Sequence, residues 1–490
     1  MNSEAQSAIR NSGMLLIQRG LEGGIGLLIA LVIPRLMGPE TYGKYALITS
    51  ISFLFVLLSR LGFREVISRY IPRFREDSSS DALRSFFSSL VAIRAVLGFL
   101  AAILFFVLAR WWLGDFRAPV MVITAGTVLL RAISELMGAL FLGLNRAGRW
   151  GATGLIRRGF SFLLVIVGYQ VNGLEGAMFG WLVVELFLLI LGTIWTRSYL
   201  SPLLFRPRIQ TMAPFLRFGF TYFVSNMVLS VFRRSGEVFV RGLTEDYVEV
   251  GYFGLAYNIY LAAALVMPHL TLAFVPFLTR PARAGNATQL RRWVERLLKV
   301  LTIGAILSVF ATLLLREGVV PLVLGTAYRP VAGHMIPLTL ALLFVALSSV
   351  ARMLLLVFEA PRQALVGSVI RLGVFCLTVI PIILLYQSLG ACIAELVASV
   401  AFAIYLTQRA RLHNPYDLRA WWLTLLASVP FLGLLVLRGT LLVNMGLYLG
   451  FLGGYGALLF GLRLVTLDEI REVWRILTDN ALPLGERIGG

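Results

Sequence analysis

The stretch RLMGPETYGKYALITS, residues 35–50, lies between two long apolar runs and decides how the chain folds. Gly38 and Pro39 together break a helix, yet apolar residues resume within a few positions. A bilayer core about 30 Å thick needs about 20 apolar helical residues to cross it. We therefore expect Gly38 to end one membrane span and Pro39 to begin the next, where its missing N–H costs little.

The composition extends this expectation to the whole chain. Of the 490 residues 58% are hydrophobic and only 14% are charged, and the mean hydropathy is +0.84. So much apolar surface is typical of an integral membrane protein, because lipid is its solvent. The expected spans cover residues 13–36, 41–63, 86–109, 118–144, 153–171, 174–196, 214–241, 249–278, 298–315, 330–357, 364–386, 389–407, 420–437 and 443–462. The sequence therefore predicts an all-α integral membrane protein with about fourteen transmembrane helices.

The net charge of +19 comes almost entirely from arginine, since Lys44 and Lys299 are the only lysines. Such a surplus is found in nucleic-acid-binding proteins, but cytoplasmic loops of membrane proteins also carry extra Lys and Arg. With the N-terminus inside, most basic residues outside the spans fall in the even-numbered connections or at the two ends. The odd-numbered connections hold only Arg35, Lys44, Arg110, Arg117, Arg241, Arg316, Arg329 and Arg438. This asymmetry predicts that both termini are cytoplasmic and that no nucleic acid is bound.

Short segments recur with a spacing of about 210 residues, which indicates an internal repeat. TYGKYALIT near Gly43 resembles EVGYFGLAYN near Gly251, and the segment that ends at Arg158 resembles one in which Arg371 aligns with Arg157. A repeat unit of six spans gives both copies the same orientation in the membrane. The expected parts are two pseudo-symmetric six-helix lobes (1–209 and 210–418), two further spans (419–463) and a cytoplasmic tail (464–490) with an amphipathic helix.

Charged residues inside the expected spans are the candidates for function. A charge near the bilayer centre costs roughly 3 kcal/mol or more, so it normally faces protein or a water-filled cavity. The basic candidates are Arg19, Arg131, Arg233, Arg234, Arg352 and Arg371. The acidic candidates Glu22, Glu135 and Glu237 each follow an arginine by three or four residues on one helical face. For each such pair, a structural brace between packed helices is the alternative to a functional role.

Basic residues outnumber acidic ones within the spans, which favours an anionic cargo. Arg233 and Arg234 are adjacent, so Glu237 cannot neutralise both. Arginine binds phosphate through two parallel hydrogen bonds and stays charged at physiological pH. The chain has no Gly-x-x-x-x-Gly-Lys-Ser/Thr loop and no histidines at metal-ligand spacing. We therefore expect no catalytic residue, no cofactor and no metal.

The opening stretch also carries a family resemblance. Its pattern Leu-x-Gly-Pro followed by Tyr-Gly-x-Tyr resembles the start of bacterial polysaccharide flippases, which belong to the multidrug/oligosaccharidyl-lipid/polysaccharide exporter superfamily. SRYIPRFRED, residues 68–77, is similar to the first cytoplasmic loop of that family. The resemblance covers the full length through the fourteen spans, the two lobes and the short loops. It implies a MATE-like, V-shaped transporter fold in the bacterial inner membrane.

The resemblance also implies a function. Members of this family move undecaprenyl-pyrophosphate-linked oligosaccharides from the cytoplasmic to the outer leaflet by alternating access, for O-antigen or exopolysaccharide biosynthesis. The six arginines would contact pyrophosphate or acidic sugars in a central cavity. The three glutamates would balance them or carry a coupling proton, and sodium is the other coupling ion left open. The expected partners are this polyprenyl-linked oligosaccharide and membrane lipid, with the protein a monomer.

Three alternatives remain open from the sequence. A multidrug or cation antiporter of the same superfamily would need unpaired buried carboxylates to bind its cargo, whereas this chain has surplus arginine. A lipid II flippase of the same superfamily also uses cavity arginines, but its usual opening motifs are not evident. A membrane glycosyltransferase or polymerase belongs to a different class, and the short loops of this chain argue against it.

Overall fold

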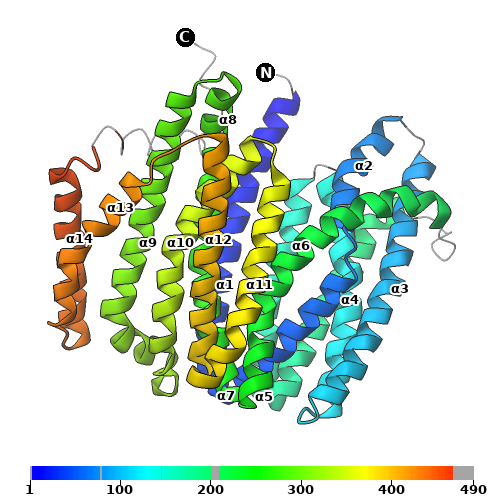
Figure 1. Cartoon of the computed structure of the whole chain (residues 1–490). Coiled ribbons are helices and arrows are strands. Elements are labelled where there is room, and N and C mark those ends of the chain that lie inside the picture. The colour runs from blue at the N-terminus through cyan, green and yellow to red at the C-terminus, as the bar shows by residue number, and fades with distance from the viewer. Residues whose placement is uncertain (1–2, 78–79, 145, 201–208, 467–468, 470–490) are drawn as a thin grey trace. The chain divides into compact units, whose positions relative to one another are not determined.

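The computed structural model describes residues 3–77, 80–144, 146–200, 209–466 and 469, and within these ranges it contains helices and no strand (Figure 1). Side chains are described from Leu21 onward, apart from scattered positions. Among the described residues, ten helices are long and apolar enough to cross a membrane. The predicted all-α membrane fold is confirmed, while the amphipathic helix expected in the tail lies outside the described residues.

The helices follow one another along the whole described chain. They are α1 (Ser3–Leu58), α2 (Phe63–Asp77), α3 (Ser80–Trp112), α4 (Ala118–Gly143), α5 (Ala147–Thr196), η1 (Arg197–Tyr199), α6 (Ile209–Thr244), α7 (Tyr247–Ala273), α8 (Val275–Arg283), α9 (Ala287–Leu324), η3 (Thr326–Tyr328), α10 (Val331–Val357), α11 (Pro361–Tyr386), α12 (Ser388–His413), α13 (Arg419–Leu426), η4 (Val429–Leu435) and α14 (Leu441–Gly461).

The expected spans correspond to these helices with some differences. The span expected over 249–278 crosses from α7 into α8, the span expected over 41–63 runs past the end of α1, and α6 is not among the ten apolar candidate spans of the described residues. Two helices contain two spans each, because non-helical residues interrupt them. In α1 the interruption is Gly38, with φ 72° and ψ 166°, at the turn that the opening stretch predicts. In α5 it is formed by Asn172 and Gly173. The span expected over residues 420–437 is broken, since α13 ends at Leu426 and the 3₁₀ helix η4 continues it.

The described chain forms two compact units. The first unit contains Met1–Met37 and Lys44–Val238, and the second contains Gly38–Gly43 and Phe239–Gly490. Most of α6, which we expected to open the second lobe, belongs to the first unit. There the ring of Phe215 in α6 lies 4.7 Å from that of Tyr70 in α2. The predicted lobe boundary at residue 210 stays a prediction.

The glycines that the repeat aligns, Gly43 and Gly251, meet within the second unit. A Cβ on Gly43 would lie 1.8 Å from the carbonyl oxygen of Tyr247, and a Cβ on Gly251 would lie 2.2 Å from that of Pro39. No side chain fits at either position, so the backbones of α1 and α7 approach closely only because both residues are glycine. Asn258 Nδ2 donates to Tyr42 Oη at 3.1 Å and extends this contact.

The internal repeat also appears in backbone geometry. Gly173, between the two spans of α5, has φ 53° and ψ −138°, and Gln387, between α11 and α12, has the same values. The separation of these two residues in the sequence equals that of Arg157 and Arg371. Each unit therefore contains the same turn at the same place in its repeat.

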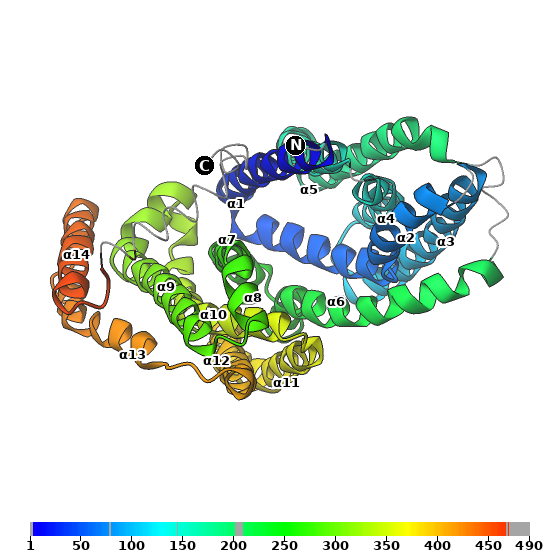
Figure 2. The ribbon, with the colours of Figure 1, turned by 90° about the horizontal axis from the view of Figure 1, so that it is seen from above.

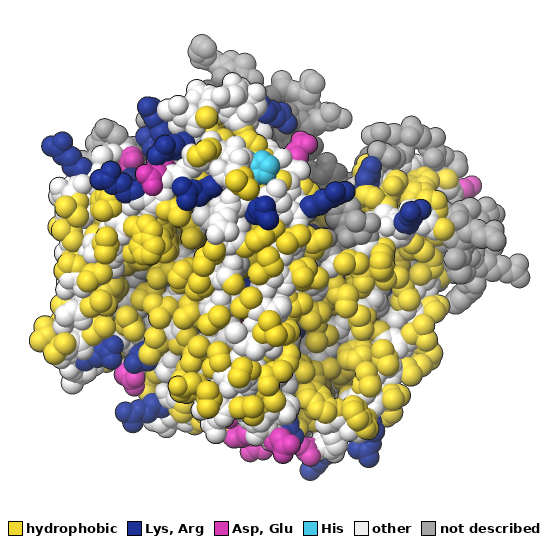
Figure 3. Space-filling model, in the orientation of Figure 1, with side chains coloured by type: hydrophobic (Ala, Val, Ile, Leu, Met, Phe, Trp, Pro, Cys, Tyr) yellow, Lys and Arg dark blue, Asp and Glu magenta, His cyan; other side chains and the backbone are white. Residues whose placement is uncertain are grey.

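The second unit packs its last spans on α9 (Figure 2). The rings of Phe310 in α9 and Phe451 in α14 stack with centroids 3.9 Å apart. On the opposite face of α14, Leu442 and Leu449 are exposed, as is typical of side chains that face lipid. On the face that Figure 3 shows, hydrophobic side chains cover the flanks of the helices, and Lys and Arg gather near their ends.

Candidate functional site

Three arginines, one in the turn after α1 and the others in α4 and α6, contact one aromatic ring in the first unit. The ring belongs to Phe53 near the end of α1. The guanidinium carbon of Arg60 lies 5.1 Å from its centroid, that of Arg131 in α4 lies 5.8 Å away, and that of Arg234 in α6 lies 5.2 Å away. Each contact has cation–π geometry. We call Phe53 with these three arginines the arginine cluster.

Glu135 holds two members of the arginine cluster in place. Its carboxylate accepts two hydrogen bonds from Arg60, at 3.1 and 2.9 Å, and one from Arg131 Nε at 3.1 Å. Arg94 Nη2 lies 3.7 Å from the same carboxylate. Three guanidinium groups therefore share one carboxylate, so this part of the first unit carries more positive than negative charge.

A second carboxylate, the buried Glu185, completes the network. Arg157 Nε donates to it at 2.9 Å and Ser134 Oγ at 2.7 Å, and Arg131 Nε lies 3.9 Å away. Four arginines thus face two glutamates in this network. Because buried charges are costly unless paired, a remaining positive surplus needs either solvent or an anion nearby.

The members of this network differ in access to solvent. The side chain of Arg94 is 2% exposed and its Nε donates to the carbonyl oxygen of Ala132 at 2.8 Å, so it has a structural role. The side chains of Arg60 and Arg131 are 34% and 18% exposed. Arg131 also lies over the ring of Trp181, at 5.7 Å. Arg157 is 20% exposed, so accessibility alone does not single out Arg60 and Arg131, but these two also contact aromatic rings.

The remaining sequence candidates lie in varied surroundings. Arg234 donates to Ser50 Oγ at 3.3 Å, Arg233 is half-buried, and Glu237 is buried with no hydrogen-bond partner for Oε2 in the described chain. Glu22 contacts Arg158 of α5, whose Nη1 donates to its carbonyl oxygen at 2.8 Å. The side chain of Arg19 lies outside the described residues. The structure thus brings Arg131, Glu135 and Arg234 together within the first unit.

The two candidates in the second unit differ from each other. Arg352 in α10 is exposed. Arg371 in α11 donates to Glu395 of α12 at 2.6 Å and to Ser399 at 3.0 Å, and Glu395 also accepts from Tyr260 at 3.0 Å. This geometry joins α7, α11 and α12, so Arg371 has the position of a structural brace.

Arg157 and Arg371, which the repeat aligns, make equivalent pairs in their own units. Arg157 in α5 reaches Glu185 in the following span, just as Arg371 in α11 reaches Glu395 in α12. In both pairs a serine shares the charged groups, Ser134 in the first unit and Ser399 in the second. The buried brace is therefore part of the repeated design rather than a feature of one unit.

Breaking either brace is expected to destabilise the protein. In Glu395→Ala, Arg371 would be left buried without its carboxylate, which typically costs about 3–5 kcal/mol. A matched substitution at the exposed pair Arg117–Glu175, Glu175→Ala, should cost less than about 1 kcal/mol. Thermal midpoints of the purified variants measure the difference. Equal midpoints for the two variants would contradict the bracing role.

Sequence reasoning missed Phe53, Arg60 and Trp181 as parts of the site. Arg60 is an in-span arginine near the end of its span, where its side chain also could have extended to the membrane surface. The signal that could have found it is the seven-residue spacing of Phe53 and Arg60 within one expected span, although in the structure α1 ends at Leu58 and Arg60 lies in the turn that follows. No sequence signal connects Trp181 with Arg131.

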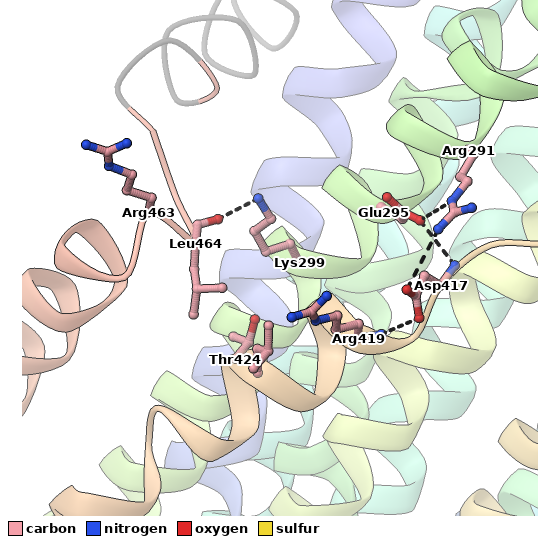
Figure 4. A pocket seen from close by; sticks show the side chains of 9 residues that line it. Arg291, Glu295, Lys299, Asp417, Arg419, Thr424, Arg463 and Leu464 are labelled. Carbon is pink, nitrogen blue, oxygen red and sulfur yellow. Dashed lines mark hydrogen bonds and ion pairs between the residues drawn. The ribbon is translucent and has the colours of Figure 1, made fainter.

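A charged pocket of about 250 Å³ lies in the second unit, between the start of α9, the connection before α13 and the segment after α14 (Figure 4). Within it, Arg291 Nε donates to Glu295 at 2.7 Å, and Lys299 Nζ donates to the carbonyl oxygen of Leu464 at 2.5 Å. Arg291 also lies 3.7 Å from Asp417. These contacts tie the last two spans to α9, so we assign the pocket a structural role.

The fold and these buried charges define a class: a helical membrane protein built from an internal repeat. A family model described as "Polysaccharide biosynthesis protein" matches residues 8–281. The chain therefore belongs to the polysaccharide biosynthesis protein family. None of the curated proteins matches the chain.

Solved structures share the fold at low sequence identity. The lipid II flippase MurJ, in an inward closed conformation, has a TM-score of 0.70 and 16% identity, over 92% of this chain and 98% of that one. An inward-facing multidrug resistance MATE transporter of the MOP superfamily has a TM-score of 0.61 and 13% identity, over 83% and 97%. The MATE transporter VcmN of Vibrio cholerae has a TM-score of 0.52 and 14% identity, over 84% and 98%.

These similarities show that the chain shares its fold with MurJ and the MATE transporters. What those proteins transport is a property of those proteins. Their sequence identity is too low to carry a substrate across to this protein.

Proposed function

We propose that this protein is a flippase for a polyprenyl-pyrophosphate-linked oligosaccharide, in the inner membrane with both termini in the cytoplasm. The observation that carries the proposal is the arginine cluster, in which Arg60, Arg131 and Arg234 converge on Phe53. Membership of the polysaccharide biosynthesis protein family supports a cargo of this chemical class. Most basic residues outside the spans lie in the even-numbered connections or at the two ends, which supports the orientation.

The geometry suits a diphosphate group. Glu135 takes up some of the donors of Arg60 and Arg131, while the other N–H groups of these arginines can donate to phosphate oxygens. Arg234 adds a third guanidinium group on the same ring. A diphosphate needs several charge-assisted hydrogen bonds to replace its hydration, and three convergent arginines can supply them.

Glu135 also keeps the site from binding its cargo too tightly. A transported group must bind well enough to enter and weakly enough to leave. A carboxylate that competes for the same guanidinium groups lowers the affinity for an anion, and it pairs with the arginines again after release. In this proposal Glu22 and Glu135 balance the arginines they contact, and Glu237 balances charge near Arg234. A role for these glutamates in ion coupling stays a prediction.

The other predicted site residues enter the proposal with different roles. Arg233 lies next to Arg234, and Arg352 is exposed on α10, so both are proposed to contact the phosphate or acidic sugars as the cargo moves. Arg19 is retained as a proposed contact from the sequence alone. Arg371 is proposed to hold the second unit together through Glu395.

Proteoliposomes containing the purified protein test the proposal directly. Three cargoes should be compared: a polyprenyl-pyrophosphate-linked oligosaccharide, lipid II and a cationic dye. We expect the lipid-linked oligosaccharide to cross the bilayer and the cationic dye to remain, because the arginine cluster repels cations. Lipid II shares the pyrophosphate, so its movement relative to the oligosaccharide measures selectivity for the glycan. Gradient-driven dye transport without movement of either pyrophosphate lipid would identify a cation antiporter instead.

A further inference from the structure

Three side chains from three helices of the second unit form a hydrogen-bonded chain that the proposed function does not use. Glu249 lies in the first turn of α7, His334 in the first turn of α10, and Ser388 begins α12. We propose that Glu249, Ser388 and His334 form a proton-binding site, and that the bound proton ties α7, α10 and α12 together.

The contacts run continuously from a half-buried to a buried group. His334 Nδ1 lies 2.9 Å from the carbonyl oxygen of Pro330, and Nε2 lies 2.6 Å from Ser388 Oγ. Ser388 Oγ contacts Glu249 Oε2, and the Ser388 backbone N–H donates to the same oxygen at 3.1 Å. His334 and Ser388 are buried, whereas Glu249 is half-buried. The accessible member of this hydrogen-bonded series is therefore Glu249.

The number of protons shared by Glu249, Ser388 and His334 follows from the donors and acceptors of these side chains. A carbonyl oxygen only accepts, so Nδ1 of His334 must carry a proton. Ser388 Oγ has a single hydrogen, yet it contacts both Nε2 and Oε2. With a neutral His334 and an ionised Glu249, both of these atoms are acceptors, and one contact would place two lone pairs against each other. One additional proton makes every contact a hydrogen bond.

The position of the additional proton follows from the helix that Glu249 caps. Ser388 is the first residue of α12, and its N–H donates to Glu249. Oε2 accepts from this N–H, and as a carboxylate oxygen it can accept from the Ser388 hydroxyl as well. The proton therefore belongs on Nε2 of His334. The chain then runs from an imidazolium through a hydroxyl to a carboxylate, and each contact is a charge-assisted hydrogen bond.

Other titratable and charged groups on the neighbouring helices have their own partners or lie further away. On α7, the Tyr252 ring lies 6.1 Å from the His334 ring, and the Tyr252 hydroxyl donates to Ala327 at 3.2 Å. Asp246 precedes α7 and caps it at Val248.

The charged groups on the other neighbouring helices are also paired or exposed. Near the end of α9, Arg316 donates to the carbonyl oxygen of Ala332 at 2.9 Å and pairs with Glu317. Arg329 is exposed before α10, and on α12 the next charged residue, Glu395, is held by Arg371. Among these neighbouring groups, Glu249 is thus the charged group that contacts Ser388 and, through it, His334.

The proton site gives the second unit a dependence on pH at one end. When the proton is lost, the Ser388 hydroxyl can donate to only one of its two partners, so α12 loses a hydrogen bond to either α7 or α10. Both hydrogen bonds are therefore present at low pH, and one of them is lost as the pH rises. Our orientation places this end outside the cell. Protons on the outer side of the membrane would then favour one conformation of the second unit. This consequence rests on the proposed flippase function, but the existence of the proton site does not.

Nitrogen NMR of the full chain in nanodiscs, with ¹⁵N-labelled histidine, tests the site without any transport. The chain contains three histidines, so few signals need assignment, and His334→Gln identifies those of His334. We expect both His334 nitrogens to carry protons at about pH 6 and Nε2 to lose its proton by about pH 9. Glu249→Gln removes the negative charge that would pair with an imidazolium, so His334 should be neutral at both pH values.

The matched control is His413→Gln, because His413 is exposed at the far end of α12, where it stacks on Phe358 and lies 3.3 Å from Gln363 Nε2. This variant should leave the His334 signals unchanged. A His334 that is neutral from about pH 6 to about pH 9 in the wild type, or that titrates identically in Glu249→Gln, would overturn the proton site. Because the readout is protonation, neither result depends on whether the protein moves lipid-linked oligosaccharide.

Discussion

Replacing Arg131 and Arg234 together with glutamine is expected to abolish export of the lipid-linked oligosaccharide. Charge-assisted hydrogen bonds contribute about 1.5–3 kcal/mol each, so losing two arginines should weaken diphosphate binding by about 100-fold or more. Glutamine keeps much of the packing against Phe53, and Arg60 keeps its two hydrogen bonds to Glu135. Surface polysaccharide in cells that depend on this protein, normalised to the amount inserted in the membrane, measures the effect.

The control for this double variant is Arg117→Gln. Arg117 is highly exposed and lies 3.3 Å from Glu175, so it carries the same charge outside the arginine cluster. This variant should export at the wild-type level. Wild-type export by the double variant at Arg131 and Arg234 would remove the arginine cluster from the mechanism.

Alanine at Gly43 or at Gly251 is expected to prevent stable folding. The added Cβ would lie 1.8 Å from the carbonyl oxygen of Tyr247 in the first case and 2.2 Å from that of Pro39 in the second. Backbone atoms cannot move aside as a flexible side chain can, so the helices would have to separate. We expect a loss above about 4 kcal/mol, the range that marks severe steric conflict. The amount of monodisperse protein after extraction, and its thermal midpoint, report this loss.

Gly304→Ala provides the matched comparison. Gly304 lies within α9 with no atom within 4 Å of an added Cβ, so alanine there should be neutral or slightly stabilising through its higher helix propensity. A Gly43→Ala variant as stable as Gly304→Ala would show that the repeated glycines do not set the approach of α1 and α7.

Much of the fold could be predicted from the sequence, because lipid imposes strong rules on spanning segments. Apolar length places the helices, and the turn at Gly38 follows from Gly-Pro between two apolar runs. The repeat was visible as weak local matches, and the structure gives them a physical basis in the Gly43–Gly251 contact and in the shared turn geometry of Gly173 and Gln387. The broken span at α13 could not be predicted, since hydropathy does not distinguish a continuous helix from an interrupted one.

The site could be predicted only in part. The pair Arg131–Glu135 follows from helical spacing, and the structure confirms it as an ion pair at 3.1 Å. The pair Arg19–Glu22 lies partly outside the described side chains, and Glu22 contacts Arg158, far away in the sequence. Helical spacing identifies neighbours on one helix, but it carries no information on contacts between helices. The convergence of Arg60, Arg131 and Arg234 on Phe53 depends on such contacts, so it required the structure.

The most direct test of the central claim is the affinity of the purified protein for a polyprenyl pyrophosphate compared with the matching polyprenyl monophosphate. If the arginine cluster holds the diphosphate, the wild type should bind the pyrophosphate at least about tenfold more tightly, because one further charged phosphate adds about 1.5–3 kcal/mol. The triple variant Arg60→Gln, Arg131→Gln, Arg234→Gln should lose this preference. Equal affinities for the two lipids in the wild type, or an unchanged preference in the triple variant, would contradict the account.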